Sequence, residues 1–259
     1  MKERIITAIC LLAVVIPVVY LGGYWFRGLM FIAVGMAAWE MMVMHNQLVK
    51  VSIGLKVLTL FATLGAVFID DFFIQGFILS SYYSVLLICF ILKKIELKTV
   101  AFYANILVYI GLSFLSLLAI RTHSLTLFIF LIATVSLTDS MAYFVGRCFG
   151  KHKLAPKISP KKTVEGAMGG WLAGASFAVV FGLMNHLFTQ RWVLVVLATG
   201  LPILSQIGDL LASALKRRYG IKDYGKIFPG HGGVMDRVDS QLLAAVLIYV
   251  IIQIGGVTS

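Results

Sequence analysis

Residues 99–120 read TVAFYANILVYIGLSFLSLLAI and residues 125–145 read LTLFIFLIATVSLTDSMAYFV, with only the four residues RTHS between them. Each block is about as long as the roughly 20 mostly apolar residues that an α-helix needs to cross a bilayer. The same bias runs through the chain, because 60% of its 259 residues are hydrophobic and only 13% are charged. Soluble domains carry about 45–50% apolar and about 25% charged residues. The sequence therefore predicts an integral membrane protein.

Further apolar blocks of this kind occur on both sides of these two, so we expect an all-α, polytopic membrane protein with about nine transmembrane helices. The expected helices cover residues 5–21, 25–44, 57–69, 72–92, 99–120, 125–145, 164–188, 192–214 and 240–254. The first block is longer than the apolar region of a signal peptide and lacks a small-residue cleavage site, so we interpret it as a retained span. The third is short, and only Asp70 and Asp71 separate it from the fourth.

The distribution of Lys and Arg predicts the orientation, because these residues favour cytosolic loops. With the N-terminus inside, 19 of the 22 basic residues fall in inside segments. These segments are residues 1–4, 45–56, 93–98, 146–163 and 215–239. A net charge of +11 then gives a basic cytosolic face that attracts anionic lipids and polyphosphates. It does not indicate nucleic-acid binding, since the basic residues flank apolar spans.

Two carboxylates stand out within the apolar blocks, where ionisable groups are costly and therefore candidates for function. They are Asp139, in the sixth expected helix, and Asp209, in the eighth. Helical spacing of four places Ser205, Asp209 and Ser213 on one stripe, which lipid would not tolerate. The alternative is that both carboxylates are polar packing contacts or pair with nearby lysines. Glu40 and His186 are lone groups near helix ends, which we interpret as interfacial.

The most unusual segment is the loop 222–239, which reads KDYGKIFPGHGGVMDRVD. Its glycines allow sharp turns and let backbone N–H groups approach a phosphate. Asp236 and Asp239 follow on one face at the start of the last expected helix, where the helix dipole favours negative charge. Carboxylates surrounded by basic residues suggest a magnesium–polyphosphate site. The alternative is a solvated glycine-rich connector whose basic residues only set topology.

At this point the sequence resembles the phosphatidate cytidylyltransferase (CDP-diacylglycerol synthase) family, in its bacterial type. The resemblance rests on SALKR at 213–217, then Lys222-Asp223-x-Gly225, then FPxHGGVxDRVD over 228–239. Further matches are Asp139 with Ala142-Tyr143, and motifs over residues 146–151, 158–166 and 205–209. Together they cover about the last half of the chain, while the first 120 residues match only as apolar spans.

The resemblance implies that the phosphate of phosphatidic acid attacks the α-phosphorus of CTP and that pyrophosphate leaves. It assigns magnesium to Asp209 and Asp236, and catalytic roles to these two together with Asp239 and Lys222. A second, monovalent cation beside magnesium is left open. The expected substrate-binding residues are Lys161, Lys162, Ser205, Lys216, Arg217, Asp223, Gly230, His231, Gly232, Gly233 and Arg237. The expected partners are CTP, phosphatidic acid and membrane lipids, with no nucleic acid.

This interpretation divides the chain into N-terminal transmembrane helices, residues 1–120, and a C-terminal transmembrane catalytic region, residues 121–259. The catalytic region carries cytosolic loops at 146–163 and 215–239, and the expected location is the cytoplasmic (inner) membrane of the cell, in a multi-pass arrangement. A glycine every four residues at Gly166, Gly170 and Gly174 permits close helix packing, within the chain or across a homodimer.

Two other classes of function stay open at this stage. One is another CTP-dependent lipid enzyme, such as a polyprenol kinase or a CDP-ether-lipid synthase, and the product would distinguish it. The other is a transporter, which is disfavoured because charge and glycine concentrate in loops and not at the bilayer midplane.

Overall fold

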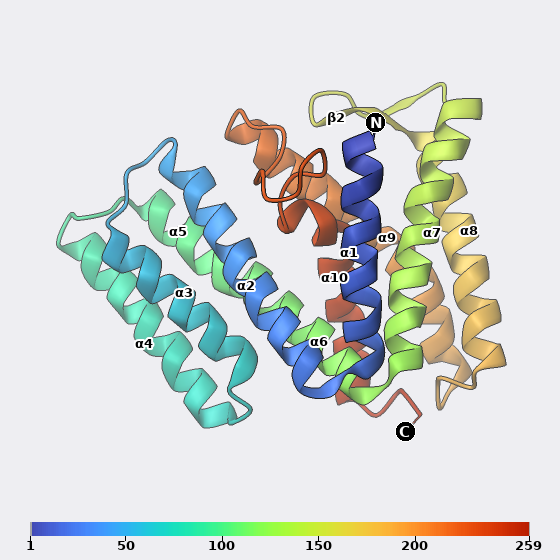
Figure 1. Ribbon diagram of the computed structural model, residues 1–259, viewed down its shortest axis with the longest axis horizontal. Coiled ribbons are helices and arrows are strands. Elements are labelled where there is room, and N and C mark those ends of the chain that lie inside the picture. Colours follow the sequence, from blue (N-terminus) through green and yellow to red (C-terminus); the bar gives the residue numbers. More distant parts are fainter. Residues whose placement is uncertain (1, 259) are drawn as a thin grey trace. The chain divides into compact units, whose positions relative to one another are not determined.

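The computed structural model describes the backbone of residues 2–258 and the side chains of residues 6–258, and the regular secondary structure of the described chain is helical apart from one short hairpin (Figure 1). The expectation of an all-α membrane protein is confirmed. In chain order the elements are α1 Lys2–Leu21, α2 Gly23–Asn46, α3 Ile53–Phe68, α4 Phe72–Ile91, α5 Leu97–Ile106, the π-helical turn η1 Leu107–Leu112, α6 Ser113–His123, α7 Leu125–Phe149, β1 Lys153–Ala155, β2 Ser159–Thr163, α8 Val164–Met184, α9 Arg191–Arg218 and α10 Met235–Gln253.

Six helices in the described chain are long and apolar enough to cross a bilayer. They are α2, α4, the continuous helix Leu97–His123, α7, α8 and α9. Two shorter apolar helices cover Ile6–Leu21 and Ile53–Phe68. The chain is therefore a multi-pass membrane protein, and the exact number of nine spans stays a prediction.

Local side-chain chemistry explains the break between the third and fourth expected helices. The Asp71 carboxylate accepts a hydrogen bond from the backbone N–H of Ile74 at 2.9 Å and so caps α4. Asp70 forms an exposed ion pair with Arg27 of α2 at 2.9 Å. The Ser52 hydroxyl caps α3 in the same way, because it accepts from the N–H of Leu55 at 3.3 Å. Capping side chains thus fix the starts of both α3 and α4.

The predicted loop 146–163 is shorter and more ordered than expected. Helix α7 continues to Phe149, and β1 and β2 then form an antiparallel hairpin that leads directly into α8. The Thr163 hydroxyl caps α8 by accepting from the N–H of Gly166 at 3.1 Å. The predicted loop 215–239 is likewise reduced to the segment between Arg218 and Met235, because α9 and α10 extend into it at either end.

The chain forms two compact units, each built from segments that are distant in sequence. Unit 1 comprises Met1–Leu118 and Asp223–Arg237, and unit 2 comprises Ala119–Lys222 and Val238–Ser259. In unit 1, α3 packs against α2, α4 and η1, around fully buried side chains such as Met42 and Tyr103. In unit 2, α8 packs between α7 and α9, and the hairpin contacts one end of these helices.

The glycine stripe of α8 packs against α7 within unit 2. A Cβ atom at Gly170 would lie 2.6 Å from the carbonyl oxygen of Thr138, and one at Gly166 would lie 2.6 Å from that of Ala142. At Gly174 the nearest atom is the Thr138 hydroxyl. The expected role in close helix packing is thus confirmed, and the stripe is used within the chain.

Candidate active site

Asp209 lies on α9 in a polar cluster within unit 2. Its carboxylate forms an ion pair with the ammonium group of Lys162 at 2.6 Å and accepts a hydrogen bond from the Ser213 hydroxyl at 3.3 Å. Lys162 belongs to β2, so the hairpin brings this predicted phosphate-binding residue to α9. The predicted helical stripe is partly confirmed, since Ser213 contacts Asp209. Ser205 instead is fully buried, and its hydroxyl donates to the Pro202 carbonyl at 3.0 Å.

Asp139 belongs to the same cluster. It accepts a hydrogen bond from the side chain of Ser240 and interacts electrostatically with both Asp209 and Lys162. Helices α7, α9 and α10 and strand β2 therefore each contribute at least one polar group here. The sequence singled out Asp139 as a functional candidate but gave it no role, and its place beside Asp209 favours a functional one over a separate packing contact.

Asp239, in the first turns of α10, is paired with the end of α9. The ammonium group of Lys216 lies 3.8 Å from its carboxylate, and Lys216 is only 8% exposed. The backbones meet close by, because a Cβ atom at Gly208 would lie 2.6 Å from the carbonyl oxygen of Asp239. Gly208 thus lets α9 and α10 approach closely beside Asp209, which explains a glycine at this position.

The neighbouring Arg217, at the end of α9, has structural partners of its own. The Arg217 guanidinium donates to the carbonyl oxygens of Ile158 at 3.4 Å and Ile221 at 3.1 Å. Burial raises the pKa of Tyr219, against the opposing charge of Arg218, so this phenol is neutral near pH 7. Lys161 and Lys222 are exposed. Their predicted roles toward phosphates stay predictions.

The glycine loop, which we define as residues 223–234, lies in unit 1 and is closed by Asp236. One oxygen of the Asp236 carboxylate accepts from the backbone N–H of Tyr224 at 2.8 Å and of Gly233 at 3.0 Å. Gly230 and Gly232 have positive φ angles of 74° and 82°, which other residues rarely adopt. The predicted sharp turns are therefore present, and the N–H of Gly233 is directed to a carboxylate of the chain.

Glu40 of α2 is the residue that the sequence interpretation placed wrongly. It is not a lone interfacial group: it is 5% exposed, and its carboxylate accepts from the backbone N–H groups of Val234 at 2.9 Å and Met235 at 3.0 Å. These partners are 194 and 195 residues away. The available signal was a single carboxylate within an apolar helix.

His231 carries a buried polar atom that lacks a hydrogen-bond partner within the described part of the chain, namely Nδ1. Its backbone N–H donates to the Phe228 carbonyl at 2.8 Å, which holds the turn. Buried polar groups are nearly always satisfied, so an orphaned ring nitrogen is the kind of atom that a ligand would complete. This observation favours the predicted phosphate contact of His231 over a purely structural role.

The donor groups fit magnesium by their chemistry. Magnesium favours carboxylate oxygens and usually takes one or two of them, completing its shell with phosphates and water. Among the side chains of residues 6–258, no three His, Cys, Asp or Glu groups gather closely enough to hold a metal alone. Asp209 lies in unit 2 and Asp236 in unit 1, so their shared role stays a prediction.

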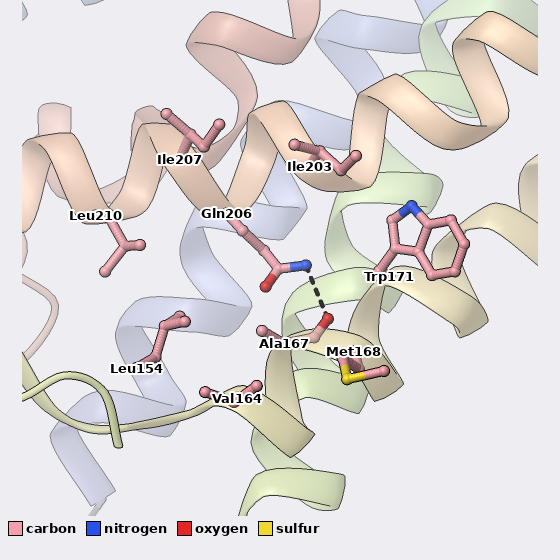
Figure 2. Close-up of a pocket in the computed structure, with 9 residues that line it drawn as sticks. All are labelled: Leu154, Val164, Ala167, Met168, Trp171, Ile203, Gln206, Ile207 and Leu210. Carbon is pink, nitrogen blue, oxygen red and sulfur yellow. Dashed lines mark hydrogen bonds between the residues drawn. The ribbon is translucent and has the colours of Figure 1, made fainter. Parts of the chain in front are cut away.

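An apolar pocket of about 310 Å³ lies between β1, α8 and α9 in unit 2 (Figure 2). Leu154, Trp171 and Leu210 are among its lining residues, none of which is charged. The only lining amide, that of Gln206, donates to the Ala167 carbonyl at 3.1 Å. Within the described chain, this pocket has no charged lining residue that could bind a triphosphate. The polar groups described above are therefore the candidate site.

Comparison with known proteins gives a consistent result. Residues 2–255 match the Cytidylyltransferase family. The chain is similar to a protein named phosphatidate cytidylyltransferase from Staphylococcus saprophyticus, with 33% identity over 97% of this chain and 99% of that protein. Proteins of the same name from Bacillus subtilis and Brucella abortus are 43% and 48% identical over 55% of this chain and 54% of each relative.

Proposed function

Because the chain belongs to the Cytidylyltransferase family, we propose that it transfers the CMP moiety of CTP to phosphatidic acid and releases pyrophosphate. The product is CDP-diacylglycerol, a precursor for phospholipid synthesis. The observation that carries this proposal is the 33% identity to a relative named phosphatidate cytidylyltransferase over nearly the whole of both chains. The helical membrane fold supports it, since the acceptor is a membrane lipid.

The reaction needs little acid–base chemistry from the protein. An oxygen of the lipid phosphate, already anionic at neutral pH, forms a bond to the α-phosphorus of CTP. The bond from that phosphorus to the bridging oxygen of the β-phosphate breaks, and pyrophosphate leaves with the electron pair. The protein therefore contributes mainly by holding the two substrates and by stabilising negative charge around phosphorus.

The basic residues of unit 2 suit this task. Lys162 and Lys216 are each held by a carboxylate, Asp209 and Asp239 respectively, so both ammonium groups are fixed before the substrate arrives. A positioned cation loses less conformational entropy on binding an anion than a freely moving one. We assign these lysines to substrate phosphates, and propose Lys161, Lys222 and Arg217 of unit 2 and Arg237 of unit 1 as further phosphate contacts.

In unit 1 the glycine loop supplies the other half of the proposed machinery. We assign contacts with the nucleotide phosphates to His231, Gly230 and Gly232. The Nδ1 atom of His231, which lacks a hydrogen-bond partner among the described residues, supports this assignment. Gly233 and Asp223 are the further substrate-binding residues proposed here. Magnesium, held by Asp209 and Asp236, would neutralise phosphate charge when bound. Asp239 is proposed as an orienting group through its ion pair with Lys216.

We further propose that the glycine loop and the hairpin face the cytosol and that the protein resides in the cytoplasmic membrane. The bias of 19 basic residues in 22 toward one side supports this orientation. The glycine stripe of α8 gives no support to a homodimer, because α7 occupies it.

The acceptor specificity tests the proposed function. Purified protein in detergent micelles should release pyrophosphate from CTP when phosphatidic acid is present. Diacylglycerol, which has the same acyl chains and no phosphate, should give none. Equal pyrophosphate release with and without phosphatidic acid would contradict the proposal, because the lipid phosphate is the proposed nucleophile.

A further inference from the structure

The carboxylate of Glu40 occupies the start of α10 from a different helix. The first backbone N–H groups of a helix have no partner within that helix and favour a negative charge. Those of Val234 and Met235, where α10 begins, each donate to a separate oxygen of Glu40, at 2.9 and 3.0 Å. Helix α10 is thus capped by a buried side chain of α2.

Two residues of the glycine loop lie so close to this carboxylate that only glycine fits there. A Cβ atom at Gly233 would collide with the carboxylate of Glu40, and one at Gly225 would lie 2.5 Å from Oε1 of Glu40. Neither glycine has a positive φ angle. Close approach to Glu40 therefore explains both glycines, in addition to any approach to phosphate.

Glu40 and Asp236 divide three successive backbone N–H groups between them. Gly233 donates to Asp236 at 3.0 Å, and the next two residues donate to Glu40. Asp236 also interacts electrostatically with Glu40. Since Asp236 is the residue directly after Met235, a displacement of Glu40 shifts both the backbone that carries Asp236 and the loop that Asp236 closes.

We propose that Glu40 is a positioning residue for the reaction, which acts by fixing the glycine loop and the start of α10 so that Asp236 is correctly placed. The proposal rests on the proposed function, in which Asp236 and the loop bind magnesium and nucleotide phosphates. It assigns to the N-terminal apolar half of the chain a direct share in the geometry of the site.

The test is Glu40→Gln, which keeps the size of the side chain. A glutamine offers one carbonyl oxygen, and its NH₂ group would face the second backbone N–H as a donor against a donor. We expect turnover to fall by about tenfold or more, as for a buried N–H group left unsatisfied. We also expect faster hydrogen–deuterium exchange at the amides of residues 233–235, a readout that does not depend on turnover.

Asp70→Asn is the matched control, because it removes a carboxylate of unit 1 that forms an exposed ion pair with Arg27. It should leave both turnover and exchange of the glycine loop as in the unaltered protein. If Glu40→Gln fails to accumulate, Gly225→Ala pushes on the same carboxylate and should produce the same two changes. Gly54→Ala, where a Cβ atom meets open space, is its control.

Gly225→Ala and Glu40→Gln together also test whether Gly225 and Glu40 act on each other. If Gly225 is a glycine because of Glu40, the effects of Gly225→Ala and Glu40→Gln on turnover should be strongly non-additive. Rescue of part of the lost turnover by Glu40→Asp, which restores two acceptor oxygens on a shorter side chain, would further support positioning.

Unchanged hydrogen–deuterium exchange at residues 233–235 in Glu40→Gln would overturn the proposal. Faster exchange at these amides with normal turnover would also overturn it. Lower turnover with unchanged exchange would assign Glu40 a direct role and overturn positioning. If the unaltered protein makes no CDP-lipid, the proposed function fails, and exchange alone then decides whether Glu40 holds the loop.

Discussion

Gly208 is the position where a small substitution should most directly distinguish an effect on the geometry of the site from an effect on the stability of the protein. In Gly208→Ala the new Cβ atom would lie 2.6 Å from the carbonyl oxygen of Asp239, a backbone atom that cannot rotate away. Restoring an ordinary contact of at least 3.4 Å requires α9 and α10 to separate by about 0.8 Å. Asp209 follows Gly208 directly and Lys216 lies on the same helix, so both move relative to Asp239 on α10.

The consequences for turnover and for stability differ in size. A misplacement of about 1 Å at reacting groups can cost about 100-fold in rate, and we expect a loss of that order. Overpacking typically costs about 1–3 kcal/mol of folding free energy, so the protein should still accumulate in the membrane. Turnover is measured in detergent micelles with labelled CTP and phosphatidic acid, and stability by thermal unfolding of the same preparation.

Gly200→Ala is the matched control on the same helix. There the nearest atom is Cδ2 of Leu247 at 2.8 Å, the end of a flexible side chain of α10 that can shift. We expect near-normal turnover. If Gly208→Ala also keeps near-normal turnover, or if both variants lose it equally, the placement of Asp209 by the α9–α10 contact is refuted.

Three further predictions concern the charged groups themselves. Asp209→Asn and Asp236→Asn should each lower turnover by about 100-fold or more, because electrostatic stabilisation of the reacting phosphates is lost. Near-normal incorporation of label from CTP into lipid by a membrane-inserted variant would exclude the substituted residue as a metal ligand. Lys162→Met should raise the KM for CTP by about tenfold or more, as for loss of a charged contact, and an unchanged KM would place Lys162 outside the phosphate site. A chelator should abolish turnover and added magnesium should restore it, and undiminished turnover in the chelator would contradict the magnesium assignment.

The sequence was sufficient for the membrane fold, because hydrophobic length and the distribution of charge are properties of single helices. The break at Asp71 shows where local reasoning was weak but possible, since an N-cap aspartate before an apolar run is a recognisable helix start. The hairpin at 153–163 was missed, because it is short, basic and without alternation of apolar residues.

The site was predictable only where its residues fall in one motif. Asp209 and Lys162 were both identified, but their ion pair joins β2 to α9 across 47 positions and no local pattern indicates it. Glu40 shows the limit more clearly. Its hydrogen-bond donors are backbone N–H groups 194 and 195 residues away, and backbone groups carry no sequence signal. Gly233 is predicted from the sequence to let the backbone approach a phosphate, and no local pattern indicates that the Glu40 carboxylate closely approaches both Gly233 and Gly225.

The fate of each phosphate of CTP tests the central claim most directly. Parallel reactions with phosphatidic acid should use CTP labelled either at the α-phosphate or at the γ-phosphate. We predict that the α-label enters the chloroform-soluble product and that the γ-label appears only in pyrophosphate. A γ-label in the lipid would identify a phosphoryl transfer of the kinase type, and no label in the lipid from either form of CTP would contradict cytidylyl transfer altogether.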